Sequence, residues 1–78
     1  MADSIRAVVK RYEVPEKGIE FMDYTYYPND HQKIFERVMQ ITGNDYEISQ
    51  DAASWCELAH EGEIYEFREG EIEIMDIP

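Results

Sequence analysis

The segment EIYEFREGEIEIMDI, at residues 63–77, decides the fold because apolar and charged residues alternate through most of its length. Such alternation, with a period of two, is typical of β-strands that bury one face. The central Glu69-Gly70 pair predicts a hairpin with a two-residue loop, in which Glu66 faces Glu73. The side chains expected on the inner face are Tyr65, Phe67, Ile72 and Ile74, and those expected on the outer face are Glu66, Arg68, Glu71 and Glu73.

A second hairpin is predicted at the start of the chain. Residues 4–14 and 19–27 are rich in β-branched and aromatic residues, and a Pro-Glu-Lys-Gly turn separates them. If Val14 faces Ile19, then Lys10 faces Asp23, a favourable cross-strand pair. A β-bulge in either strand would shift this register. Without a bulge, one face would carry Ile5, Ala7, Val9, Met22, Tyr24 and Tyr26.

The middle of the chain predicts two helices. Asp30 is suited to cap a helix over residues 31–42, and Gly43 is suited to end it. Ser49 is expected to cap a second helix that ends at Gly62. The element order ββααββ predicts a small α+β fold, in which two helices pack on one face of a single-layer antiparallel sheet. We expect residues 1–78 to form a single domain.

Composition narrows the class of protein. The 78 residues are 44% hydrophobic and 13% aromatic, which distinguishes the chain from an acidic disordered tail. Cys56 is the only cysteine, so the fold has no intramolecular disulfide, as is usual in a reducing compartment. No signal peptide and no run of the ~18 apolar residues needed for a membrane span is recognisable. We therefore expect a cytoplasmic protein without a membrane partner.

The charge is concentrated in the second half of the chain. Residues 1–43 carry seven acids and six bases, whereas residues 44–78 carry eleven acids and only Arg68, so the two halves have net charges of −1 and −10. An anionic surface repels nucleic acid and anionic membrane, and attracts basic protein surfaces. The candidate partner-binding residues are Glu57, Glu61, Glu63, Glu66, Glu69, Glu71, Glu73 and Asp76.

Two interpretations of this charge remain open. The first is a non-enzymatic protein that docks on a basic protein surface. One form of it is an inhibitor that mimics nucleic acid, by analogy of size and charge alone with small acidic anti-CRISPR and anti-restriction proteins of phages and mobile elements. The second is a small cytosolic accessory domain that self-associates, for example as a homodimer, and uses its charge for solubility.

Catalytic, cofactor and metal sites receive little support from the sequence. Cys56 and His60 stand at i and i+4, a spacing that could serve a thiol enzyme or a zinc site, but core packing of the thiol is the simpler interpretation. Asp45, Glu47 and Asp51 do not match the spacing of a calcium loop. We expect no enzyme, no cofactor and no metal. The tyrosines at 12, 24, 26 and 27 are expected in the core or at a protein interface.

Overall fold

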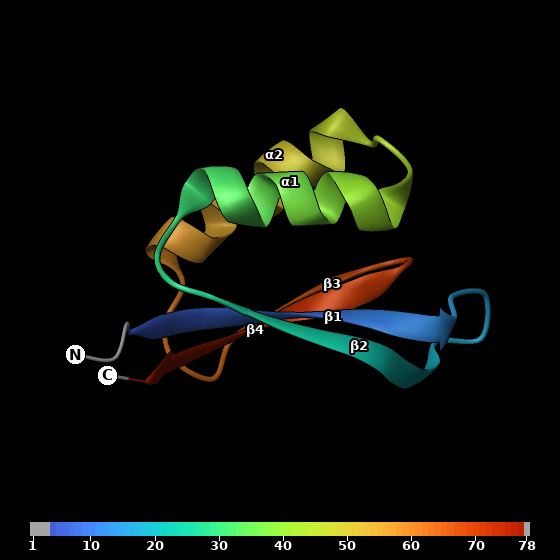
Figure 1. The fold of residues 1–78 in the computed structure, drawn as a ribbon, viewed down its shortest axis with the longest axis horizontal. Coiled ribbons are helices and arrows are strands. Elements are labelled where there is room, and N and C mark those ends of the chain that lie inside the picture. Colours follow the sequence, from blue (N-terminus) through green and yellow to red (C-terminus); the bar gives the residue numbers. More distant parts are fainter. Residues whose placement is uncertain (1–3, 78) are drawn as a thin grey trace.

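The computed structural model describes residues 4–77 and contains a four-stranded antiparallel sheet with two helices on one of its faces (Figure 1). The predicted α+β fold is therefore confirmed. In space the strands follow the order β2-β1-β4-β3, so the first and last strands of the chain are the central pair. The elements are β1 (Ile5–Val14), β2 (Ile19–Tyr27), α1 (His31–Thr42), α2 (Tyr46–Leu58), β3 (Ile64–Phe67) and β4 (Gly70–Ile77).

The core lies between the sheet and the helices. The central strands and both helices contribute side chains to it, and most of these are at most 1% exposed. Removing this apolar surface from water is the main favourable contribution to folding. The buried residues are Ala7, Val9, Ile34, Val38, Ala52, Ala53, Cys56, Ala59, Ile72 and Ile74.

The first helix begins and ends where the sequence predicts. The Asp30 side chain accepts a hydrogen bond from the backbone N–H of Lys33 at 3.1 Å, and Gly43 adopts the left-handed conformation with a φ of 71°. That conformation favours glycine, which has no Cβ to clash.

The predicted bounds of the second helix are wrong at both ends. Asp45, rather than Ser49, is the N-cap, since its side chain accepts from the backbone N–H of Ile48 at 3.1 Å. Ser49 is buried inside the helix and donates its hydroxyl to the Asp45 carbonyl at 2.7 Å. The helix ends at Leu58, well before Gly62, because the backbone is already extended at Ala59.

The second hairpin has the predicted faces but a shifted register. Phe67 pairs with Gly70 and Glu66 pairs with Glu71, so the loop is Arg68-Glu69 rather than Glu69-Gly70. The pairing of Glu66 with Glu73 was therefore wrong. Because the shift is two residues along β4, the side chains within the two strands keep their predicted faces. Arg68, which was predicted on the outer face, instead lies in the loop. Tyr65, Phe67, Ile72 and Ile74 all contribute to the core, as expected.

In the first hairpin a bulge overturns the predicted face of β2. Val14 pairs with Ile19 as expected, but the register shifts between Arg11 and Tyr12, and Lys10 then pairs with Tyr24 rather than with Asp23. A bulge adds one residue to one strand, and one residue is enough to invert which face a side chain occupies. The prediction that Tyr24 and Tyr26 share the face of Ala7 and Val9 is therefore wrong.

Candidate functional site

The helices leave one face of the sheet uncovered (Figure 1). This face, here called the open face, includes two rows of cross-strand neighbours. Side chains alternate between faces, so the neighbours of the buried residues Ala7 and Val9 point the other way. One row consists of Tyr26, Val8, Glu73 and Ile64, and the next consists of Tyr24, Lys10, Glu71 and Glu66. The three acids predicted on the outer face of the hairpin thus lie together on the open face.

Lys10 forms ion pairs with two of these three acids. Its Nζ lies 2.8 Å from Oε1 of Glu73 and 3.4 Å from Oε2 of Glu71. Burial lowers the pKa of Lys10, but the hydrogen bond to Glu73 and the negative charge of Glu71 raise it by more, so the net pKa lies above its usual value. Sequence reasoning placed Lys10 opposite Asp23, and so missed this contact.

Arg68 does not take the central place among the acids that the sequence suggested. It lies in the β3–β4 turn, its side chain is 68% exposed, and its Nη2 is 3.4 Å from Oε1 of Glu16. The cation at the centre of the acidic cluster is therefore Lys10 of β1, and not the arginine of the hairpin itself.

Aromatic rings cover the β2 side of the open face. Tyr12 and Phe21 stack with ring centroids 4.7 Å apart. The rings of Phe21 and Tyr24 pack edge to face, with centroids 5.9 Å apart. Lys10 Nζ lies 5.2 Å from the centroid of Phe21 and 5.8 Å from that of Tyr24, within the range of cation–π attraction. Tyr24 and Tyr26 remain 53% and 51% exposed.

A second acidic surface follows α2 and the loop that leads to β3. Residues 44–67 contain seven carboxylates and no lysine or arginine. Contacts of Tyr65 hold this region together: its ring lies 5.5 Å from Trp55, and its hydroxyl donates to Oδ2 of Asp51 at 2.8 Å. Burial and the bond to Asp51 raise the pKa of Tyr65 to about 12. The exposed acids of this segment, here called the acidic margin, are Glu47, Asp51, Glu57, Glu61 and Glu63. Glu47 and Asp51 lie beside Tyr65 of β3, whereas Glu57 lies beside His31 of α1.

The eight predicted partner-binding residues do not form one surface. Glu66, Glu71 and Glu73 lie on the open face. The other acids are spread over the margin (Glu57, Glu61, Glu63), the β3–β4 turn (Glu69) and the end of β4 (Asp76). Besides Asp51, two margin acids contact their own chain. Oε1 of Glu57 lies 3.2 Å from Nδ1 of His31, and Glu63 accepts from the backbone N–H of His60 at 2.5 Å.

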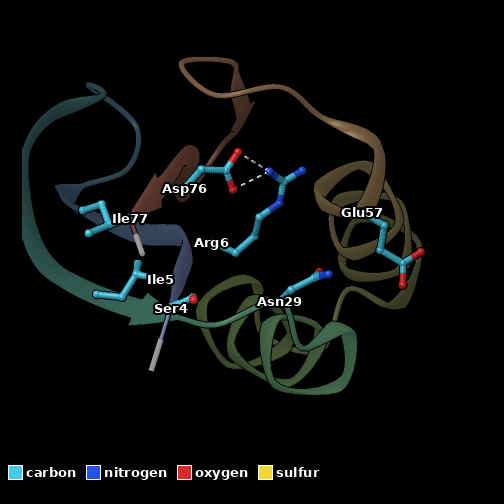
Figure 2. Close-up of a pocket in the computed structure, with 7 residues that line it drawn as sticks. All are labelled: Ser4, Ile5, Arg6, Asn29, Glu57, Asp76 and Ile77. Carbon is cyan, nitrogen blue, oxygen red and sulfur yellow. Dashed lines mark hydrogen bonds and ion pairs between the residues drawn. The ribbon is translucent and has the colours of Figure 1, made fainter. Parts of the chain in front are cut away.

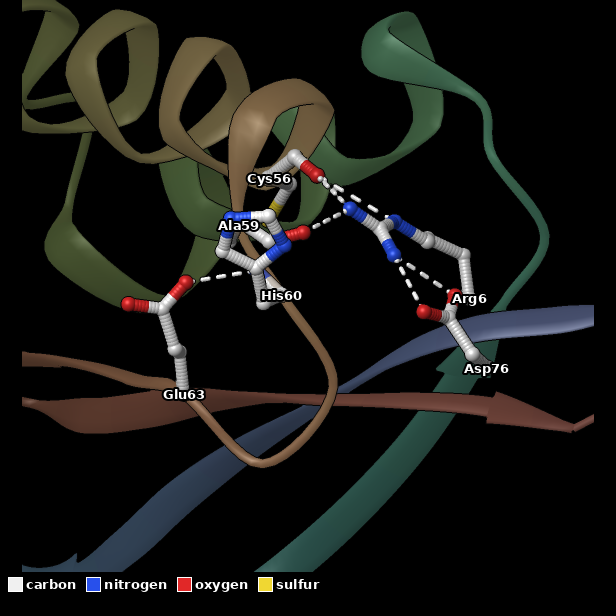
Figure 3. A network of polar contacts seen from close by, with 6 residues as sticks. All are labelled: Arg6, Cys56, Ala59, His60, Glu63 and Asp76. Atoms are coloured by element: carbon white, nitrogen blue, oxygen red, sulfur yellow. Dashed lines mark hydrogen bonds and ion pairs between the residues drawn. The ribbon is translucent and has the colours of Figure 1, made fainter.

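Asp76 belongs to a structural network rather than to an acidic surface (Figure 3). Nη1 of Arg6 donates to both of its carboxylate oxygens at 2.6 Å. The other Arg6 donors bind the carbonyls of Cys56, at 2.9 and 3.2 Å, and of Ala59. These contacts account for all the donors of a guanidinium.

A shallow groove of about 380 Å³ lies beside this network (Figure 2). It is lined by Ser4, Ile5, Arg6, Asn29, Glu57, Asp76 and Ile77. Because the Arg6 donors are directed at Asp76 and at α2, the groove offers no free guanidinium to an anionic ligand (Figure 2). The lining contains neither cysteine nor histidine, the usual nucleophile and base of a thiol enzyme.

Cys56 and His60 occupy different environments. Cys56 is 1% exposed, and burial raises the pKa of its thiol to about 12, so the thiol is protonated at neutral pH. His60 is exposed and lies beyond the last residue of α2, so the two residues do not share a helix face. Within residues 4–77, no group of three or more His, Cys, Asp or Glu side chains is placed to hold a metal ion.

Neither helix in the described part of the chain is long and apolar enough to cross a membrane. No protein-family model matches this chain, and comparisons with curated proteins and with solved structures find no match.

Proposed function

We propose that this protein is a non-enzymatic interaction protein that docks on a basic protein surface. The observation that carries the proposal is the acidic margin, where exposed carboxylates stand without a neighbouring lysine or arginine in the sequence. Five of the seven lysines and arginines lie in ion pairs with acids outside the margin: Arg6, Lys10, Arg11, Arg37 and Arg68. Within residues 4–77, no lysine or arginine forms an ion pair with an acid of the margin.

The size of the net charge supports a role in binding over a role in solubility alone. A net charge of magnitude roughly 2–8 is sufficient to keep a small domain soluble, and this chain has −11. The same negative field disfavours nucleic acid and anionic lipid as partners. The single cysteine is free and buried, which suits a reducing compartment, and we place the protein in the cytoplasm.

A more specific form of the proposal is occlusion of a nucleic-acid-binding protein. Duplex DNA presents about one negative charge per 1.7 Å of its axis, and proteins that bind it neutralise phosphates with lysine and arginine. Carboxylates on α2 and on the loop that follows it can occupy such a basic groove, and the Tyr65 contacts hold α2 against β3.

The test compares two variants with the same net charge. The margin variant is Glu47→Gln/Glu57→Gln/Glu61→Gln, and its control is Glu13→Gln/Glu20→Gln/Glu36→Gln in the first half of the chain. Each is used, beside the wild type, as bait at low salt in a lysate of the source cells, and the captured proteins are identified by mass spectrometry. We expect the margin variant to lose the basic partner and the control to keep it.

The identified partner then separates the two forms of the proposal. Binding should weaken steeply between 50 and about 200 mM salt, as it does for electrostatic complexes. If the protein occludes a nucleic-acid site, added duplex DNA should compete for the partner. Equal capture by both variants would show that the margin serves only solubility.

Self-association is the second candidate, and the edge strand β2 favours it. Ile19, Met22, Tyr24 and Tyr26 of this strand are each about half exposed, and edge strands can pair with another chain. Sedimentation equilibrium across a concentration series tests it. A homodimer that persists at high salt supports this candidate, whereas a monomer at all concentrations excludes it.

A further inference from the structure

The open face already holds a cation between aromatic rings and carboxylates, and that cation belongs to the chain itself. Lys10 lies against Phe21 and Tyr24 on one side and against Glu71 and Glu73 on the other. Only 14% of its side chain is exposed, so this contact is part of the folded structure rather than a surface pairing.

Groups of the same two kinds remain accessible around Lys10. On the β2 side, half of the surface of Tyr24 and of Tyr26 faces solvent. On the other side, the side chain of Glu73 is 36% exposed, and Glu66 lies exposed on the edge strand β3. The accessible tyrosines lie on β2 and the accessible carboxylates lie on β4 and β3, so a cationic segment that crosses the strands of the open face can contact both kinds of group.

We propose that the open face is the docking surface for an arginine-bearing segment of the protein partner, with Tyr24 and Tyr26 as stacking platforms and with Glu66 and Glu73 as ion-pair acceptors. This inference rests on the proposed function and names the partner's chemistry at a second surface. Arginine fits better than lysine, because a guanidinium is planar, weakly hydrated and able to stack on an aromatic ring.

Charge also distinguishes this occupant from a second copy of the chain. The open face carries Glu66, Glu71 and Glu73 against the single charge of Lys10. Apposing two copies would bring these carboxylates together between chains of net charge −11. A cationic segment instead meets complementary charge, and the exposed tyrosines supply the aromatic area that is enriched at protein interfaces.

The test uses the whole 78-residue chain, labelled with 15N, and two defined probes: nona-arginine and nona-lysine peptides at about 150 mM salt. We expect nona-arginine to bind more tightly, and the largest amide shifts to occur at Val8, Lys10, Tyr24 and Tyr26. The Tyr24→Ser/Tyr26→Ser variant should bind nona-arginine about tenfold more weakly. The Tyr24→Phe/Tyr26→Phe variant keeps both rings and should bind as the wild type does.

Two further variants test whether the effect on peptide binding is specific to the open face. Tyr46→Ser removes a tyrosine that is 62% exposed at the start of α2, away from the open face, and should leave binding unchanged. The margin variant described above should weaken both peptides similarly. The retained dispersion of the amide spectrum shows that each variant is folded.

Three outcomes overturn the inference. If the shifts fall on the acidic margin and the serine variant binds normally, the open face is not the docking surface, although the proposed function stands. If the open-face amides shift with protein concentration alone, a second copy occupies that face. If neither peptide binds, the inference and the proposed function fail together.

Discussion

The guanidinium of Arg6, near the start of β1, binds both carboxylate oxygens of Asp76, near the end of β4, at 2.6 Å. The same side chain donates to the carbonyls of Cys56 and Ala59, at the C-terminal end of α2. Helix carbonyls at this end lack partners within the helix and carry partial negative charge. Arg6 therefore joins the central strands to the end of α2 (Figure 3).

Removing Arg6 should cost more stability than removing its acidic partner. We expect Arg6→Met to lower the free energy of unfolding by about 2–3 kcal/mol, because it leaves helix carbonyls that hydrogen-bond to a charged group without a donor. Asp76→Asn should cost less than about 1 kcal/mol, since the Asp76 side chain is 41% exposed and solvent screens the pair. Urea unfolding of both variants measures the difference. Equal losses would show that the ion pair, rather than the cap on α2, dominates.

Lys10 and Glu71 should be energetically coupled. In Lys10→Met, the Glu71 side chain, only 12% exposed, loses its cation, and we expect the free energy of unfolding to fall by about 2 kcal/mol. Adding Glu71→Gln to this variant should recover part of the loss, because the amide is neutral. A double-mutant cycle by chemical denaturation measures the coupling. Strict additivity of the two changes would contradict the role of Lys10 as the partner of Glu71.

Gly70 should tolerate no side chain. A Cβ at this position would collide with the backbone carbonyl oxygen of Lys10, on the neighbouring central strand. We expect Gly70→Ala to destabilise the protein by about 2–3 kcal/mol, as overpacking does. Gly18→Ala is the control: its φ of 60° disfavours alanine by about 1 kcal/mol, but no atom lies within 4 Å of the added Cβ. Thermal unfolding of both variants ranks them.

Cys56 should make the protein less stable at high pH. Burial raises the pKa of the folded thiol from 9.0 to about 12, so above pH 9 the unfolded chain releases a proton that the folded chain retains. The contribution of the Cys56 thiol to the free energy of unfolding is therefore complete below pH 9 and is lost as the pH rises toward 12. Tyr65, whose pKa rises from 10.0 to about 12, acts in the same direction.

The measurement is urea unfolding at pH 8, 9 and 10 for the wild type and for Cys56→Ala. The free energy of unfolding should fall more steeply with pH in the wild type than in the variant. A thiol reagent at pH 8 should label Cys56 only after denaturant is added, because the native thiol is buried and protonated. Rapid labelling of the native protein would contradict both expectations.

The faces of the second hairpin were predictable because alternation survives an even shift of register. Its loop moved to Arg68-Glu69 as Gly70 was drawn into β4, yet Tyr65 and Ile72 stayed on the core face. The start of α2 was misjudged, although the sequence holds the signal: Asp45 is as good an N-cap as Ser49, and Ile48 continues the apolar face of the helix. The acidic margin could likewise be predicted from residues 44–67, which lack lysine and arginine.

The sequence alone determined the order of elements, the caps of α1, the inner face of the β3–β4 hairpin and the excess of acid in the second half. These depend on local spacing and on composition, which the chain carries without reference to its fold. Tertiary structure decided the central position of β1 and β4, the bulge that turns Tyr24 and Tyr26 to the open face, and the cation that each acid meets. Lys10 reaches Glu73, and Arg6 reaches Asp76, only because the two ends of the chain pair in the sheet.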